Sequence, residues 1–215
     1  MTDERKTPLL EEDRTRAHQF QTHSDPQAVS MTDPSKFTPS DILDFWFSED
    51  VKSKWFAGGK SFDDELRQRF TTLLQKARLG ELTHWAENPD GALALVILLD
   101  QLSRNIHRGT PEAFAADALA LETAKHAIAQ GYDLRLAPEG RGFLYMPFEH
   151  SEVLADQERG VALFEALGAA ESLDYMRRHR DIIARFGRFP HRNAILGRSS
   201  TAEEIEFLKQ PGSSF

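Results

Sequence analysis

The chain has 215 residues, 40% of them hydrophobic and 10% aromatic, which is enough for one globular domain with a substantial core. Its 34 Asp and Glu outnumber its 26 Lys and Arg, and the formal net charge of −8 argues against binding to nucleic acid or anionic membranes. The absence of cysteine excludes disulfides, thiolate metal sites and cysteine nucleophiles. No apolar run is long enough for a signal peptide or a membrane span, so we expect a soluble, cytoplasmic protein.

Residues 1–38 predict a polar N-terminal arm and not a domain, with a short helical pattern only at residues 9–20. Met1-Thr2-Asp3 recurs as Met31-Thr32-Asp33, which leaves two alternatives open: the arm is genuine, or translation starts at Met31. Its acidic segment LLEED could dock on a neighbouring chain or in the protein's own groove. We expect one all-α domain at 39–209 and a tail at 210–215.

The rest of the chain predicts helices throughout. Apolar residues keep helical spacing in segments that start at capping residues such as Ser40 and Ser61 and stop at glycines such as Gly80. The expected helices lie at residues 41–47, 61–79, 91–107, 110–130, 150–167, 171–186 and 201–208, with a shorter helical piece around residues 82–85. Residues 131–148 are expected to be irregular. Because no alternating strand pattern follows residue 40, we predict an all-α helix-hairpin array of about eight or nine helices.

The run GALALVILLDQLSRNIH (residues 91–107) predicts a central helix around which the others pack. Its first half is apolar on every side, which is typical of a helix enclosed by other helices. At ~100° per residue, Asp100, Arg104 and His107 share one face, with two carboxamides beside them. The polar end of this buried helix is therefore the strongest candidate for a site.

Two later helices carry polar residues on their apolar faces. His150 and Gln157 interrupt the apolar face of one helix, and His179 interrupts that of the next. Each histidine alone is more typical of a hydrogen-bonded core residue than of a ligand-binding one. The polar end of the central helix adds a second possibility, that these histidines line one shared pocket. The two interpretations, a shared pocket and separate core histidines, are then evenly balanced.

Arginines crowd residues 177–198 of an otherwise acidic chain. The first of them are explained by i,i+4 pairing with carboxylates such as Asp181 on a solvated helix face. The segment FGRFPHRN (residues 186–193) is different, because its Phe and Pro residues should anchor it and leave four polar side chains available, those of Arg188, His191, Arg192 and Asn193. This arrangement suits recognition of a carboxylate or a phosphate.

We therefore predict one polar, locally basic ligand-binding pocket between the end of the central helix, the segment around Glu149 and FGRFPHRN. Its predicted residues are Asp100, Gln101, Arg104, Asn105, His107, Glu149, His150, His179, Arg185, Arg188, His191, Arg192 and Asn193. No metal is expected, because the histidines are scattered and no pair has the i,i+4 spacing of a helical metal site. The sequence names no cofactor.

Three long motifs, in this order, resemble a bacterial family, domain of unknown function 924. The motifs are LLDQLSRNIHRG (98–109), FLYMPFEHSE (143–152) and FGRFPHRNAILGRSSTAEEIEFL (186–208), with DFWF (44–47) and WF (55–56) upstream. The family commonly has DQFPRN where this chain has Leu102 and Ser103, a change that we do not expect to alter the site. The resemblance covers residues 40–208 and implies a tetratricopeptide-like all-α fold, but it implies no activity.

Three hypotheses about function stay open. The first, slightly preferred, is a module that binds an anionic peptide segment or a small acid. The second is a hydrolase or lyase in which Glu149 or His150 acts as the general base, Asp100 orients an imidazole, and Arg104 or Arg188 stabilises an oxyanion. The third is that the polar motifs only pair buried groups and cap helices.

Overall fold

The computed structural model describes residues 36–214, and the chain divides into two units, Met1–Thr32 and Asp33–Phe215. The predicted arm at residues 1–38, with its short helix and acidic segment, falls almost entirely outside the described residues. Within residues 36–214 the structure contains helices, turns and bends but no strand, so the all-α prediction is confirmed. The tetratricopeptide-like arrangement of these helices stays a prediction.

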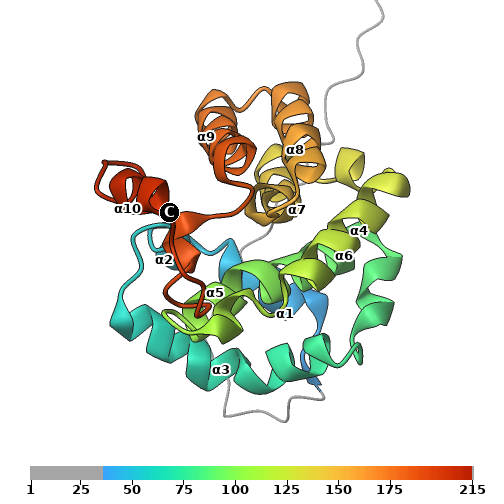
Figure 1. Cartoon of the computed structure of the whole chain (residues 1–215). Coiled ribbons are helices and arrows are strands. Elements are labelled where there is room, and N and C mark those ends of the chain that lie inside the picture. The colour runs from blue at the N-terminus through green and yellow to red at the C-terminus, as the bar shows by residue number, and fades with distance from the viewer. Residues whose placement is uncertain (1–35, 215) are drawn as a thin grey trace, which may run out of the picture. The chain divides into compact units, whose positions relative to one another are not determined.

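Figure 1 shows the order of the helices. They are α1 (Pro39–Trp46), α2 (Glu49–Lys52), α3 (Lys60–Arg78), α4 (Pro89–Val96), α5 (Ser103–Ile106), α6 (Asp117–Ala129), α7 (Pro138–His150), α8 (Leu154–Leu167), α9 (Ala170–Phe186) and α10 (Ala202–Phe207). Short 3-10 turns η2 (Thr83–Glu87), η4 (Pro111–Phe114), η5 (Asp133–Arg135) and η6 (Pro190–Arg192) connect some of them.

The central helix is enclosed, as the sequence predicts. It consists of α4, a π-helical turn η3 (Ile97–Leu102) and α5, which follow one another without a break. Residues 91–103 are all buried, with α1, α6 and α7 packed against α4 and with α3 packed against η3 and α5. In a π-helical turn the hydrogen bonds run from i to i+5, and such turns are often found at functional sites.

The segment at residues 131–148, expected to be irregular, is instead mostly helical. Its α7 runs from Pro138 to His150 and contains two glycines and Pro147, which lower its intrinsic helix propensity. Packing against the central helix overrides that propensity: a Cβ at Gly140 would lie only 2.9 Å from Leu93 Cδ2, so glycine permits the close approach. The helix expected to begin at His150 therefore begins only at Leu154.

Helix ends largely follow the expected capping chemistry. The cap of α1 is Thr38 and not Ser40, because Pro39 occupies the first helical position and the Thr38 side chain forms a capping box with Asp41. The second expected box, between Thr201 and Glu204, is present at α10.

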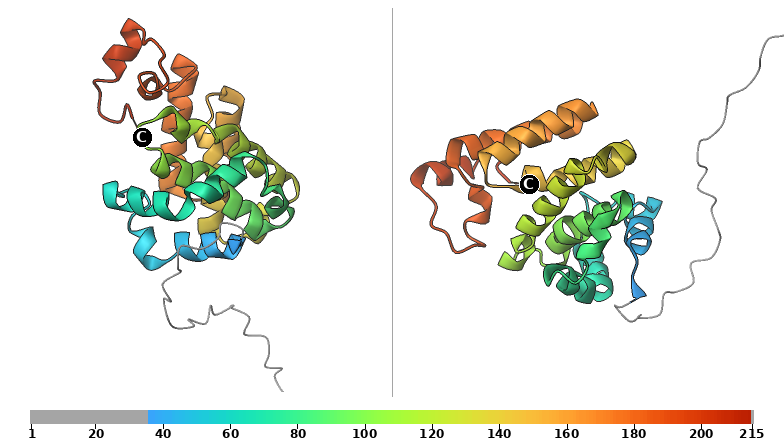
Figure 2. Two further views of the ribbon diagram at one scale, coloured as in Figure 1. Left: turned by 90° about the horizontal axis from the view of Figure 1, so that it is seen from below. Right: turned by 90° about the vertical axis from the view of Figure 1, so that its right-hand side faces the viewer.

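The C-terminal segment has a small apolar cluster of its own. Most buried apolar side chains belong to one core that includes the central helix, whereas Ile182, Ile183 and Phe189 form a second cluster with Phe186 and Phe207. Helices α8 and α9 lie side by side and α7 packs on α8 (Figures 1 and 2). The end of α9 and the residues after it are therefore held to the main core largely by polar contacts.

No helix among the described residues is long and apolar enough to cross a membrane.

Two glycines give a stability test of this packing. A Cβ at Gly91 would lie 2.0 Å from the Trp85 carbonyl oxygen, so Gly91→Ala should destabilise the protein by at least about 1–3 kcal/mol. Gly142 is helical, and a Cβ there would meet no atom within 4 Å, so Gly142→Ala should stabilise the protein by about 0.5–1 kcal/mol. Urea unfolding of both variants measures the two changes in the free energy of unfolding. Changes of the same sign would contradict the prediction.

Candidate functional site

The site is built around Asp100, a fully buried carboxylate in the π-helical turn. Its Oδ1 lies 2.8 Å from Nδ1 of His150 and accepts a hydrogen bond of 3.0 Å from Nη1 of Arg104. Its Oδ2 accepts a hydrogen bond of 2.6 Å from Nε2 of Gln101. Since a buried charge is costly unless it is paired, these three donors are what allow the carboxylate to lie inside the protein.

Asp100 is ionised at neutral pH. Burial opposes its ionisation, but the positive charge of Arg104, followed by the influence of His150, outweighs burial and holds the pKa of Asp100 well below its usual range. An ionised carboxylate can only accept hydrogen bonds, so the proton between Asp100 and His150 is assigned to Nδ1 of the imidazole.

A chain of charges continues from Asp100 to the C-terminal segment. Arg104 Nη2 donates to Oδ2 of Asp117 at 3.0 Å, and Arg104 Nη1 lies 2.9 Å from the other oxygen without the alignment of a hydrogen bond. Arg192 Nη1 lies 3.5 Å from Asp117 Oδ2 and donates to the His150 carbonyl oxygen at 3.1 Å. Asp117 therefore connects one arginine of the central helix with one arginine of η6.

Arg192 is held by two aromatic rings. Its guanidinium carbon lies 4.7 Å from the ring centre of Phe114 and 4.4 Å from that of Phe189, and its side chain is only 7% exposed. Burial and the nearby charge of Arg104 lower the pKa of Arg192 to about 10, which still leaves it charged at neutral pH. Its buried Nε has no hydrogen-bond partner, and Nη2 makes no hydrogen bond with the described residues.

Three histidines gather beside this chain of charges. The His150 and His179 ring centres are 6.4 Å apart, and His179 Nδ1 lies 3.0 Å from Oε1 of Glu149. Phe189 contacts the rings of both His179 and His191. Burial, followed by the charges of Arg192 and His179, lowers the pKa of His191 to about 4, so this imidazole is neutral at neutral pH.

The structure thus brings together many of the predicted residues. We use the name polar cluster for Asp100, Gln101, Arg104, Asp117, Glu149, His150, His179, His191 and Arg192. They come from the central helix, α6, α7, α9 and η6, which lie far apart in the sequence. Most of these side chains are buried, and their charges are largely paired with one another.

Two of the predicted arginines form ion pairs outside the polar cluster. Arg188 donates from Nε and Nη2 to the two oxygens of Glu204, at 2.6 and 2.8 Å, and Arg185 pairs with Glu203 on the surface. Asn193, also predicted, donates to Ser200. These residues organise the C-terminal segment around α10.

Two predicted residues of the central helix also lie apart from the polar cluster. His107 follows the π-helical turn and lies beyond the end of α5 at Ile106, so it does not share the face that regular helical spacing predicts. Burial and the charge of Arg78 lower its pKa. Asn105 accepts a hydrogen bond from Arg108, which forms a bidentate pair with Asp63.

Asp117 and Phe114 are the site residues that the sequence analysis missed. Asp117 is an acidic residue in the first turn of α6, where a carboxylate stabilises the helix dipole without any further role. Phe114, in the short η4 turn, looks in the sequence like an ordinary core residue. The path of the chain after Gly109 is what brings both residues near Arg104, and the spacing of the sequence contains no signal for that path.

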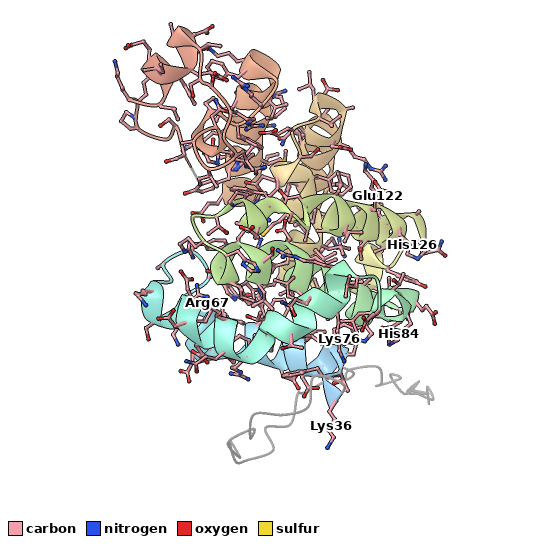
Figure 3. The ribbon with its side chains drawn as sticks, turned by 60° about the horizontal axis from the view of Figure 1, so that its bottom comes forward. Lys36, Arg67, Lys76, His84, Glu122 and His126 are labelled. Atoms are coloured by element: carbon pink, nitrogen blue, oxygen red, sulfur yellow. The ribbon has the colours of Figure 1, made fainter. Side chains whose placement is uncertain are left out.

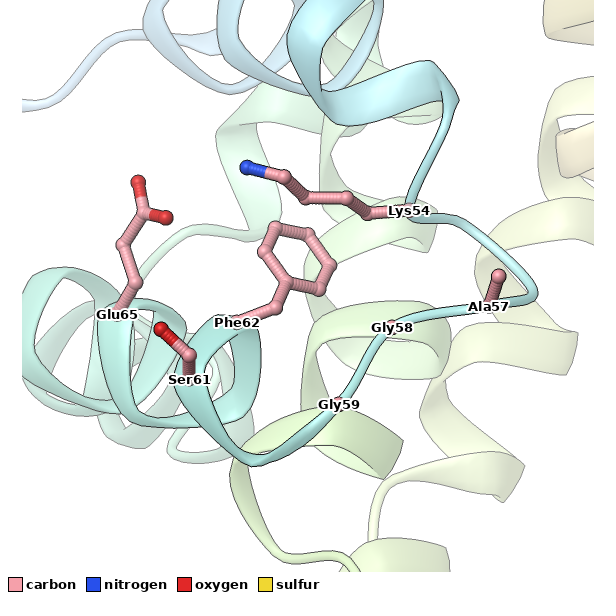
Figure 4. A pocket seen from close by; sticks show the side chains of 7 residues that line it. All are labelled: Lys54, Ala57, Gly58, Gly59, Ser61, Phe62 and Glu65. Atoms are coloured by element: carbon pink, nitrogen blue, oxygen red, sulfur yellow. The ribbon is translucent and has the colours of Figure 1, made fainter.

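Two surface hollows lie away from the polar cluster. One, of about 230 Å³, is lined by the Gly58-Gly59 loop with Lys54, Phe62 and Glu65 (Figure 4). The other, of about 400 Å³, extends past the same glycines to Arg108, whose charge Asp63 already pairs. Within the described residues, no group of three or more His, Asp or Glu side chains is arranged to hold a metal ion.

The fold and the site define an all-helical protein with a buried, histidine-rich polar cluster at the end of its central helix. The model of the family described as "Bacterial protein of unknown function (DUF924)" matches residues 42–212, and the chain belongs to this family. A solved structure, that of the protein of unknown function ATU0120 from Agrobacterium tumefaciens, is 42% identical, with a TM-score of 0.76 over 80% of this chain and 96% of that one. No curated protein matches the chain.

Breaking the central ion pair should cost far more than breaking a surface pair. Arg104→Ala leaves the buried Asp100 carboxylate without its strongest partner and should destabilise the protein by about 3–5 kcal/mol. Arg185→Ala removes a pair in which both side chains are more than half exposed, so it should lower the free energy of unfolding by less than about 1 kcal/mol. Denaturant unfolding of both variants at neutral pH compares them, and equal losses would show that the central pair stabilises the protein no more than a surface pair does.

The Arg188–Glu204 pair should make stability depend on acid pH. Hydrogen bonds from Arg188, and a further one from the Thr201 amide, lower the pKa of Glu204 from 4.5 to about 2. The stabilisation is therefore complete above about pH 4.5 and is lost as the pH falls through 2. Unfolding of wild type and Glu204→Gln should differ at pH 6 and converge towards pH 2, whereas exposed Glu203→Gln should change little. A difference that does not shrink in acid would contradict this assignment.

Proposed function

We propose that the polar cluster binds a small molecule bearing a carboxylate or a similar oxyanion, and that Arg192 recognises it. The observation that carries the proposal is the edge of the Arg192 guanidinium formed by Nε and Nη2, which has no hydrogen-bond partner among the described residues. Two parallel N–H groups match the two oxygens of a carboxylate.

Other arginines of the same protein use this edge to hold carboxylates, which supports the proposal. Arg188 uses Nε and Nη2 to hold Glu204, and Arg108 uses the same two nitrogens to hold Asp63 at 2.7 and 3.0 Å. Arg198 also has an Nε without a partner, but its Nη1 and Nη2 are both occupied by Glu152. In Arg188 and Arg108 a carboxylate bonds this edge. In Arg192 no carboxylate of the described residues does.

Arg192 is also prepared for binding. The rings of Phe114 and Phe189 fix the plane of the guanidinium, and the bonds from Nη1 fix its rotation, so little conformational entropy is lost when a ligand binds. A buried donor without a partner costs about 1–3 kcal/mol, and a ligand oxygen that displaced the side chains covering Nε would recover that cost. The charge of Arg104 attracts an anion to this place, whereas the nearby carboxylates of Asp117, Glu152 and Asp100 oppose it.

A small acid fits this site better than an extended peptide. Because the Arg192 side chain is only 7% exposed, a long segment could reach it only through a terminal or side-chain carboxylate. The acidic arm of the chain or a neighbouring protein would have to bind in that way. If instead the polar cluster only ties helices together, no anion should depend on Arg192.

The test compares two Arg→Lys variants that keep the charge and remove the two-nitrogen edge. Native mass spectrometry of protein purified without added ligand shows whether an anion copurifies, and titration calorimetry measures binding of acetate, malonate and inorganic phosphate as probes. We expect Arg192→Lys to weaken binding of the best probe by roughly tenfold or more, the factor equivalent to one lost charged hydrogen bond.

Arg188→Lys is the matched control, because Glu204 already fills the edge of Arg188, and it should bind the probe as wild type does. Absence of probe binding in the wild type, or equal affinity in wild type and Arg192→Lys, would reject the proposal and favour a purely structural role for the polar cluster.

A further inference from the structure

We infer that His150 is the proton-transfer group of this site, with Asp100 as its positioning residue. The inference depends on the proposed function only for the identity of its substrate, a small acid held by Arg192. It goes beyond binding, because it assigns a chemical step to the polar cluster.

The first support is the rigid contact between His150 and Asp100. Nδ1 of His150 lies 2.8 Å from Oδ1 of Asp100, whose side chain has no solvent exposure. The carboxylate cannot turn away, because Arg104 and Gln101 donate to it from the same helix. A carboxylate held in this way fixes both the orientation and the tautomer of the imidazole, and it stabilises the imidazolium that forms when the ring takes up a proton.

The second support is the other ring nitrogen of His150. With the proton on Nδ1, Nε2 carries a lone pair, and no described residue forms a hydrogen bond with Nε2. The side chain is 13% exposed, compared with 5% for His179, whose Nδ1 lies near both Glu149 and the Tyr175 carbonyl oxygen. Of these two carboxylate-paired imidazoles, His150 is the one with more access to solvent.

The third support is the place of Arg192 relative to His150. Nη1 of Arg192 donates to the backbone carbonyl oxygen of His150, so the two residues adjoin. No hydroxyl group of the described residues is bonded to Nε2, so the arrangement does not form a nucleophile–base pair of the kind used in acyl transfer. Proton abstraction next to a carboxylate, as in isomerases and lyases, fits better than covalent acyl transfer.

The step needs no other reagent. Nε2 of His150 accepts a proton from the carbon atom next to the substrate carboxylate, and the electron pair of the broken C–H bond stays on the substrate. The negative charge that develops on the carboxylate oxygens faces the guanidinium of Arg192, while Asp100 stabilises the imidazolium. Return of the proton to another carbon completes an isomerisation, and loss of a leaving group from the neighbouring carbon completes an elimination.

The test measures the nucleophilicity of each histidine, which does not require the substrate. Diethyl pyrocarbonate acylates neutral imidazole nitrogens, and peptide mass mapping gives the rate at each position. His84 and His126 lie exposed on the surface and serve as internal references (Figure 3). We expect His150 to react faster than both, although it is far less exposed, and Asp100→Asn to slow it by roughly tenfold or more because the carboxamide no longer fixes the tautomer.

Asp133→Asn is the matched control for loss of a buried carboxylate, since Asp133 bonds Tyr145 outside the polar cluster, and it should leave the rate at His150 unchanged. Nitrogen-15 NMR should show the Nδ1–H tautomer of His150 in the wild type and a loss of that preference in Asp100→Asn. A merely structural Asp100 would alter stability without altering the tautomer.

A rate at His150 below both references, or an equal rate in wild type and Asp100→Asn, would overturn the inference. Its failure is distinct from failure of the proposed function. If probe binding does not depend on Arg192 but the rate at His150 still depends on Asp100, only the proposed binding site is rejected. Binding of a probe acid without Asp100-dependent reactivity rejects the proton-transfer role alone.

Discussion

One buried carboxylate sets the arrangement of the polar elements of this protein. Asp100 has no solvent to stabilise its charge, so donors must surround it, and they come from the adjacent Gln101, from Arg104 one turn further along the helix and from His150 of α7. Arg104 then needs a second partner, which Asp117 at the start of α6 provides. The need to pair a single charge thus fixes how three elements meet.

The same chain of pairing attaches the C-terminal segment. Ile182, Ile183 and Phe189 form an apolar cluster too small to hold this segment in place alone. Arg192 reaches Asp117 and the His150 carbonyl, and Glu152 accepts from Arg198 and from the Phe189 amide. The proposed ligand edge therefore lies on a segment whose position depends on polar contacts, which links ligand recognition to the attachment of that segment.

The helices could be predicted because their apolar spacing is a local property, and the enclosed character of residues 93–99 follows from apolar side chains on every side of the helix. The helix at Pro138–His150 was missed because glycine and proline oppose it locally, whereas burial of its apolar side chains against the neighbouring helices favours it. For the site, His179 was predicted from its place on the apolar face of its helix, whereas His150 was assigned to the wrong helix, because it ends α7 and α8 begins only at Leu154. The choice of Arg192 over Arg188 could not be predicted, because it depends on where Glu204 lies in space.

The π-helical turn at Ile97–Leu102 is equivalent to one extra residue in an otherwise regular helix. An extra residue rotates everything after it by about 100° relative to everything before it. The apolar half of the helix can then keep its packing while the polar half points in a direction of its own. Insertion or deletion of a residue at this turn would rotate the polar half of the helix without disturbing the packing of the apolar half. A related chain could therefore point the same polar residues in another direction by a change at this turn.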